Sequence, residues 1–523
     1  MELRNINDID NATKQSRREL FRIGMALLFI VGIMLYVFSL DSLGGRPSTL
    51  LIIAAMIGGY MAINIGANDV ANNVGPAVGS KALTLTGAIL IAAVFEASGA
   101  LIAGGDVVST IKKGIIDPSG MISSDSFVWM MMAALLAGAI WLNVATALGA
   151  PVSTTHSIVG GVLGAGIAAG GMGIANWDKM GAIAASWVIS PVLGGLIAAG
   201  FLYLIKRTVT YKTDMLEAAK KVVPFLVAIM AWAFGTYLML KGLKKIWKVD
   251  FITAAGIGLV TAVLIYIIVR PLIAKAAAKL TNDKDSVNSL FTIPLIFSAA
   301  LLSFAHGAND VANAVGPLAA INEVISTGNV VSKAAIPLWV MMIGALGIAI
   351  GLALYGPKLI KTVGSEITEL NKMRAFCIAM AASITVIIAS QLGLPVSSTH
   401  IAVGGIFGVG FLREYLKASY AKMVEEIKHH HESDNPEEVE EFLLEFKKAD
   451  LEQKRLMLYE LKKNASETNL TKKERKQLKK VYNTELVKRS HLYRIAAAWV
   501  ITVPVSGLLA AMLYFTIRGM MLP

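Results

Sequence analysis

Two polar motifs of this sequence carry side chains that could bind ions. GANDVANNVGP at residues 66–76 recurs as GANDVANAVGP at 307–317, identical at ten of eleven positions. Both lie beside long apolar runs, so Asp69 and Asp310 fall at apparent membrane depth. An intramembrane aspartate is costly and marks a functional site by default. The pair therefore predicts a hard-oxygen site for a small cation, built from carboxylate and amide oxygens and freed backbone carbonyls.

A second pair of motifs offers the complementary chemistry for an anion. PVSTTH at 151–156 recurs as PVSSTH at 395–400, each some 85–90 residues after its GAND motif. A proline can open a helix, and the hydroxyls that follow would lie in its first turn, next to free N–H groups that suit an oxyanion. None of the four motifs contains Arg or Lys. An anion bound there would be held by dipoles, hydroxyls and co-bound cations, which makes cation coupling natural.

The elements that position these motifs must be membrane helices. Of the 523 residues, 55% are hydrophobic and 16% are charged, and the mean hydropathy is +0.63. Thirteen apolar runs reach spanning length, an upper count because broken or re-entrant segments inflate it. The first run, 21–40, has no cleavage pattern, which predicts a retained helix rather than a signal peptide. The net charge of +12 lies mostly in loops and indicates membrane topology, with no nucleic-acid partner.

The motif pairs divide the chain into two repeats. A third pair, AASWVIS at 184–190 and AAAWVIT at 496–502, is offset by 312 residues, whereas the first two are offset by 241 and 244. An insert therefore lies in the second copy, and two apolar runs separate the copies. The odd number of spans between equivalent helices predicts opposite orientations. We expect a tail and extra helix (1–47), the first repeat (48–206), a connecting segment with two helices (207–288), the first part of the second repeat (289–411), a charged insert (412–494) and the last helix (495–523).

Hydrocarbon offers no hydrogen-bond partners, so we expect each GAND motif to break its helix where the backbone packs in protein or lines a hydrated cavity. Gly66 and Gly307 would permit the unusual dihedral angles, and Pro76 and Pro317 would each start a new helix. The predicted fold is an all-α polytopic membrane protein with two inverted repeats, broken or re-entrant helices and about 12–13 membrane segments. A helical insert would lie outside the membrane.

Three further residues invite a coupling or gating role. His156 and His400 each follow a serine by three residues; a packing histidine is the favoured interpretation, and a nucleophile's base the least favoured. Glu96 is acidic at apparent membrane depth and has no acidic counterpart around 343–346, so ion binding and a buried hydrogen bond stay equally open. The single cysteine excludes an intramolecular disulfide and argues against a thiolate metal site.

The doubled GANDVAN and PVS[ST]TH signatures resemble the inorganic phosphate transporter family, also called the type III sodium-phosphate cotransporter family. The resemblance covers about residues 48–411 and 493–517. It implies symport of inorganic phosphate with sodium or protons, and a phosphate site near the membrane centre between the two repeats. GAND in both copies resembles the sodium-coupled branch. This sequence departs from the family pattern in its extra first helix, in the Asn73/Ala314 difference between the copies and in its charged insert.

Residue roles follow from the resemblance by motif position. The expected phosphate-binding residues are Asp69, Asn72, Ser153, Thr154, Thr155, Asp310, Asn313, Ser397, Ser398 and Thr399. The expected sodium ligands are Asn68, Asp69, Asn309, Asp310, Thr154 and Ser398. No cofactor is expected, because sodium is a co-substrate.

The leading hypothesis is a sodium-phosphate symporter of the cell membrane that works by alternating access. A proton-coupled phosphate, metal-phosphate or sulfate symporter of the same fold is the nearest alternative. An intramembrane hydrolase and a passive anion channel are the other classes; the first is disfavoured because both sites are duplicated without a nucleophile elbow. Loop charges place the insert 412–494 in the cytoplasm, although the lysines of 241–250 disagree. For the insert, a regulatory or homodimer contact and a solvated spacer stay equally open.

Overall fold

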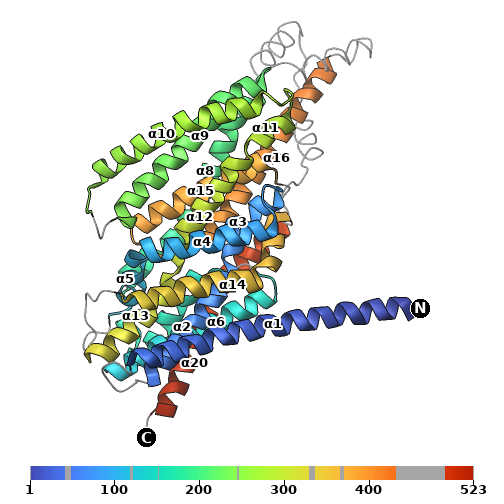
Figure 1. Ribbon diagram of the computed structural model, residues 1–523. Coiled ribbons are helices and arrows are strands. Elements are labelled where there is room, and N and C mark those ends of the chain that lie inside the picture. Colours follow the sequence, from blue (N-terminus) through green and yellow to red (C-terminus); the bar gives the residue numbers. More distant parts are fainter. Residues whose placement is uncertain are drawn as a thin grey trace.

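The computed structural model describes residues 2–41, 49–117, 122–150, 152–243, 247–328, 336–365, 370–430 and 489–521 (Figure 1). All named elements of this described part are helices. They are α1 (Glu2–Asp41), α2 (Thr49–Asn68), α3 (Val70–Gly79), α4 (Leu85–Ala103), α5 (Gly105–Lys113), α6 (Ser124–Ala147), α7 (Thr154–Gly170), η1 (Met172–Ile174), α8 (Trp177–Ile205), η2 (Lys206–Thr210), α9 (Met215–Tyr237), η3 (Leu238–Gly242), α10 (Phe251–Ala277), α11 (Lys284–Leu290), α12 (Thr292–Asp310), α13 (Ala312–Thr327), α14 (Leu338–Ser365), α15 (Lys372–Gln391), α16 (Ser398–His430) and α20 (Arg489–Met521).

Eleven helical segments of the described chain are long and apolar enough to cross a membrane. The first, Glu19–Leu40, lies in α1 and matches the retained helix expected at 21–40. Two of the thirteen apolar runs, 152–172 and 396–412, are not among these segments. They correspond to α7 and the first part of α16, whose first residues are buried inside the protein. The chain is therefore a multi-pass, all-helical membrane protein.

The two sequence copies pack in the same way. Helix α2 packs on α14 as α12 packs on α4, and α7 packs on α20 as α16 packs on α8. A Cβ atom added to Gly66 would lie 1.9 Å from the carbonyl oxygen of Ile348, and one added to Gly307 would lie 2.1 Å from that of Glu96. The backbones touch at both places, which is the usual role of small residues between membrane helices. Because Gly66 and Gly307 are equivalent, these contacts make Ile348 the counterpart of Glu96. The position expected from the sequence lies slightly earlier, around 343–346.

Each GAND motif interrupts its helix, as expected, but only at one residue and without the unwound backbone that was predicted. The junctions of α2 with α3 and of α12 with α13 fall at Asp69 (φ −83°, ψ −37°) and Val311 (φ −55°, ψ −30°), both helical conformations. Pro76 and Pro317 lie inside α3 and α13 instead of starting new helices. The irregularity in the first copy is one tightened turn, in which the N–H of Asn72 donates to the carbonyl of Asp69 at 3.0 Å. The motif's glycines permit close packing, so the backbone has no need to unwind.

Irregular backbone occurs instead before α7 and α16. Helix α6 ends at Ala147 and is followed by Gly149 at φ +70°, and α15 ends at Gln391 and is followed by Gly393 at φ +65°. Glycine adopts this left-handed conformation without steric cost, which makes it the usual residue just after a helix end. Ser153, just before α7, is extended (φ −89°, ψ 119°), and residues 394–397, before α16, are non-helical. The non-helical segments therefore belong to the PVS motifs and not to the GAND motifs.

The remaining helices lie around this double core. Helices α9 and α10 lie side by side at one end of the molecule, and α1 runs past α2 with its N-terminal part projecting away from the bundle (Figure 1). Helix α16 continues beyond its membrane-depth part to His430, into the predicted insert 412–494. Residues 431–488 of that insert lie outside the described residues, so its expected fold and contacts stay predictions.

Candidate functional site

The first asparagine of each GAND motif holds the irregular segment that precedes α7 or α16. The Asn68 amide donates to the Thr146 hydroxyl (2.9 Å) and the Ala150 carbonyl (3.2 Å), and its oxygen accepts from the N–H of Val152 (3.1 Å). In the second copy the Asn309 amide donates to the hydroxyl of Ser390 at 3.0 Å. Buried backbone groups need such partners when the helix ends. The expected sodium contacts of both asparagines stay predictions.

The serines of the PVS motifs start the helices that follow. Ser153 precedes α7, and its hydroxyl oxygen accepts from the backbone N–H of His156 at 3.1 Å. Ser397 does the same before α16, accepting from the N–H of His400 at 3.2 Å. This arrangement is an N-cap, which satisfies one of the free N–H groups at a helix start. The other N–H groups of each first turn have no partner within the helix, as at any helix start.

Threonines from both copies meet at the first aspartate. The Thr154 hydroxyl donates to one carboxylate oxygen of Asp69 at 2.6 Å, and the Thr399 hydroxyl donates to the other at 2.9 Å. Thr154 belongs to the same copy as Asp69, and Thr399 belongs to the other copy. In the second copy the Ser398 hydroxyl donates to Asp310 at 2.9 Å. All five of these side chains are buried.

Amide side chains extend this network across the two copies. The Asn72 amide donates to the Thr399 hydroxyl at 2.8 Å, and the Asn313 amide donates to the hydroxyls of Thr154 (3.0 Å) and Thr155 (3.2 Å). The Thr155 hydroxyl in turn donates to the carbonyl of Val396, before α16, at 3.0 Å. The structure thus brings the ten predicted phosphate-binding residues into one buried region where both copies meet. Their contact with phosphate remains a prediction.

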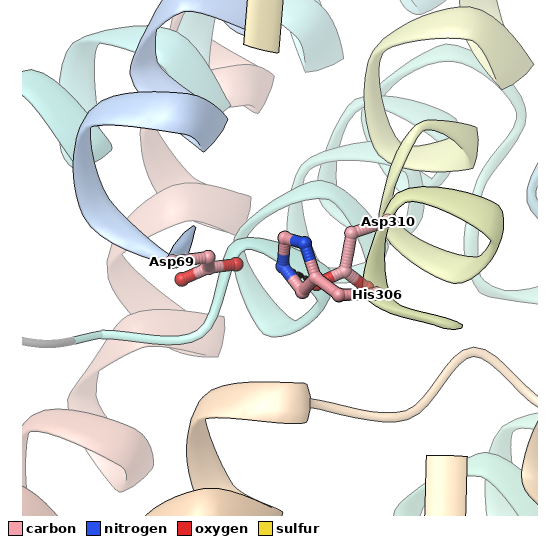
Figure 2. A group of neighbouring side chains, drawn as sticks. All are labelled: Asp69, His306 and Asp310. Carbon is pink, nitrogen blue, oxygen red and sulfur yellow. Dashed lines mark ion pairs between the residues drawn. The ribbon is translucent and has the colours of Figure 1, made fainter. Parts of the chain in front are cut away.

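One histidine joins the second aspartate to Glu96. His306 Nδ1 lies 2.6 Å from a carboxylate oxygen of Glu96, and Nε2 lies 2.7 Å from Asp310 Oδ2. The other oxygen of Glu96 accepts from the Asn73 amide at 2.7 Å. The Nε2 contact is close but not aligned as a hydrogen bond. Figure 2 shows the His306 ring beside Asp310, with Asp69 facing them.

The centre of the site has the chemistry of a cation site. One ligand atom each from Asp69, His306 and Asp310 lie within 4.8 Å of one another. Asn72 Oδ1 and Asp310 Oδ1 are buried and have no hydrogen-bond partner within the described part of the chain. A buried oxygen without a donor is costly, and a cation relieves that cost. Carboxylate and amide oxygens are ligands that hard cations prefer.

His156 and His400 lie at the contact between the copies, away from the aspartates' own hydrogen bonds. Their ring centroids are 4.3 Å apart, and each ring packs on a tryptophan: His156 on Trp187 at 3.8 Å and His400 on Trp499 at 3.6 Å. The two tryptophans are the equivalent residues of the third repeated motif. The capping serine bonds the backbone N–H of each histidine and not its ring, so this geometry forms no Ser–His dyad. The suggested gating role stays a prediction.

Comparison with known proteins decides the family. The sequence model of the phosphate transporter family matches residues 65–510, which covers both copies and the site. The chain belongs to the phosphate transporter family. Two of the relatives in this family are proteins named "Putative phosphate permease": one from Helicobacter pylori (strain J99), 55% identical over 98% of both chains, and a similarly named one from Pyrococcus horikoshii, 41% identical over 72% of this chain and 92% of that one.

A solved structure has the same fold. It is titled "The sodium-dependent phosphate transporter", superposes with a TM-score of 0.74 at 32% sequence identity, and matches 91% of this chain and 100% of its own. The family consists of transporters and not enzymes. These matches confirm the family predicted from the doubled motifs and the expectation that the chain is not an enzyme. The solved structure confirms the all-helical membrane fold.

Sequence reasoning missed His306 as a part of the site. It stands one residue before the second GAND motif, where the first copy has Ile65, and this apolar-to-ionisable difference at a repeat position was the available signal. The Asn73/Ala314 difference was noticed but left without an explanation. The structure explains it, because Asn73 bonds Glu96 whereas the counterpart of Glu96 is the apolar Ile348.

Proposed function

We propose that this phosphate transporter imports inorganic phosphate together with sodium across the cell membrane. The observation that carries the proposal is the buried network in which Asp69 of one copy is bonded by hydroxyls of both copies. Hydroxyls, amides and helix N-termini suit phosphate oxygens, and the two aspartates would repel phosphate until a cation neutralises them. Binding of the cation then promotes binding of the anion, which is the essence of symport.

The proposed mechanism is alternating access, and the positions of the hydrogen bonds support it. Bonds such as Thr399 to Asp69 and Asn313 to Thr154 join the two copies, so the site is complete only when the copies are close. The two copies are proposed to be inverted relative to the membrane, as in other secondary transporters, and to rock around this central site. The proposal also puts the charged insert in the cytoplasm, which the charges of the loops support.

The test is uptake of radiolabelled phosphate by proteoliposomes with an inward sodium gradient. The expected result is accumulation that disappears when choline replaces sodium and that Asp69→Asn abolishes. Equal uptake in sodium and choline would refute sodium coupling, and uptake that never exceeds the equilibrium level would indicate a passive channel. A melting curve of Asp69→Asn shows whether the variant is folded.

A second candidate keeps the site and changes the cation. The group of Asp69, His306 and Asp310 within 4.8 Å includes an imidazole nitrogen, which divalent transition metals accept as a ligand and sodium does not favour. This candidate is a proton-coupled metal-phosphate symporter. Uptake driven by a pH gradient and dependent on a divalent cation would favour it, and competition by unlabelled sulfate separates a sulfate carrier from both.

A further inference from the structure

The site has two halves: the first lies around Asp69, where α2 packs on α14, and the second lies around Asp310, where α12 packs on α4. The two halves differ in chemistry, although their sequences and packing are nearly the same. In the first half, the bonds that the described residues make to the carboxylate of Asp69 come from hydroxyls. In the second half, Asp310 contacts His306, and His306 is held by Glu96. The corresponding positions of the first half are Ile65 and Ile348. A chain of ionisable side chains therefore occurs in one half where the other has two isoleucines.

Helix packing does not require this chain. Helices α4 and α12 touch backbone to backbone at Gly99 and Gly307, on either side of the Glu96–His306 pair. Helices α2 and α14 make the equivalent contacts at Gly66 and Gly351. A Cβ at Gly99 would lie 2.0 Å from a carbonyl oxygen, and one at Gly351 would lie 1.9 Å from another. The same close packing therefore forms around the apolar pair Ile65 and Ile348. Comparison of the two halves shows that the packing does not depend on Glu96 and His306.

Burial makes the chain expensive, which argues for a task other than stability. Glu96, His306 and Asp310 are all buried, at 0% exposure. Replacing a buried ion pair by apolar residues of similar size is often neutral or stabilising. The Asn73 amide adds a hydrogen bond to Glu96 that the second copy, with Ala314, does without. Three residues are thus specialised together in one half, and the side chain that they reach is Asp310.

We propose that Glu96 and Asn73 are positioning residues, which act through His306 to hold the carboxylate of Asp310 in its binding geometry. Asn73 donates to Glu96, Glu96 contacts the ring of His306, and His306 Nε2 lies against Asp310 Oδ2, which Ser398 also bonds. Asp310 Oδ1 has no hydrogen-bond partner among the described residues and is therefore available to a ligand. Asp69 lacks such a support and is held by a threonine of each copy. Asp310 is thus supported by a chain of side chains from both copies, whereas Asp69 is bonded by hydroxyls from both copies. The proposal rests on the proposed function of this site in binding phosphate and cation.

The test replaces the polar residues around Asp310 by the apolar residues that stand at the equivalent positions around Asp69. The variant Glu96→Ile with His306→Ile and Asn73→Ala reproduces the residues of the other copy, and Glu96→Gln is the milder single variant. The expected result is a melting temperature equal to or above that of the wild type, together with a rise of about tenfold or more in the phosphate concentration for half-maximal binding and uptake, as loss of a charge-assisted contact implies. Ile348→Leu, at the mirror position, is the matched control and should bind phosphate as the wild type does.

Each outcome decides the proposal. Wild-type phosphate binding in the triple variant and in Glu96→Gln would overturn it, because nothing would then depend on the chain. A loss of melting temperature in step with binding, in both variants, would also overturn it in favour of a purely structural pair. Binding is measured on purified protein with radiolabelled phosphate at fixed sodium. Failure of wild-type uptake to depend on sodium would refute the proposed coupling and leave this binding comparison intact.

Discussion

Replacement of Gly307 by alanine should separate two helices that carry the site. An added Cβ would lie 2.1 Å from the carbonyl oxygen of Glu96, whereas a relaxed carbon–oxygen contact is about 3.3 Å. Helices α4 and α12 must therefore move apart by about 1 Å. Overpacking of this kind costs up to about 3 kcal/mol. Alanine recovers about 1 kcal/mol through its higher helix propensity, so the expected net destabilisation is about 2 kcal/mol.

The assay is thermal unfolding of the purified protein in detergent, followed by phosphate uptake. Gly307→Ala should lower the melting temperature and weaken phosphate binding, because the 2.6 Å contact of Glu96 with His306 spans the same two helices. Gly256→Ala in α10 is the control, since no atom lies within 4 Å of its added Cβ, and it should melt as the wild type does. Gly66→Ala should destabilise as much but leave the Glu96 contact in place. A Gly307→Ala protein with wild-type melting and uptake would refute the packing argument.

Three further predictions concern the hydroxyls, a helix cap and pH. Thr399→Val should greatly weaken phosphate uptake while Thr399→Ser retains most of it, because only the hydroxyl bonds Asp69; uptake kinetics decide, and equal defects would point to a role of the methyl group. Ser397→Ala should cost about 1 kcal/mol of stability by removing the α16 cap, as measured by melting. Asp283 lies between spans and caps α11, and hydrogen bonds from the Thr281 hydroxyl and the Ser286 N–H lower its pKa. The stability that the Asp283 carboxylate contributes is present above its unfolded pKa and is lost as the pH falls through its folded pKa. The protection factor of α11 against hydrogen exchange should therefore fall below about pH 4 in the wild type and show no such step in Asp283→Asn.

The repeated motifs made much of the site predictable from the sequence. Two copies of one signature, matched over both GAND and PVS segments, place the same side chains in the same buried region, and the structure brings them together. The position of the helix irregularity was not predictable from residue types alone. Gly66 fits an unwound turn and a close helix contact equally well, and only the presence of the α14 backbone beside it selects the second.

Contacts between copies were the other feature beyond sequence reasoning. Thr399 lies 330 residues from Asp69, and no local pattern indicates that it bonds this carboxylate rather than the one in its own copy. His306 was missed for a related reason. Its partner Glu96 lies in the other copy, so neither residue shows its pairing until α4 and α12 are packed together.

The distribution of bonds indicates how the transporter could cycle without a large barrier. Asp310 contacts Ser398 of its own copy and His306 of its own helix, and these two contacts survive a relative motion of the copies, whereas the contact of His306 with Glu96 crosses between them. The bonds from Thr399 to Asp69 and from Asn313 to Thr154 do not survive that motion, because they cross between copies. Leaving a buried polar group without a partner costs about 1–3 kcal/mol. In the proposed cycle a bound cation and anion replace those partners, and water replaces them once the site opens, so the proposed ligands also lower the cost of the proposed motion.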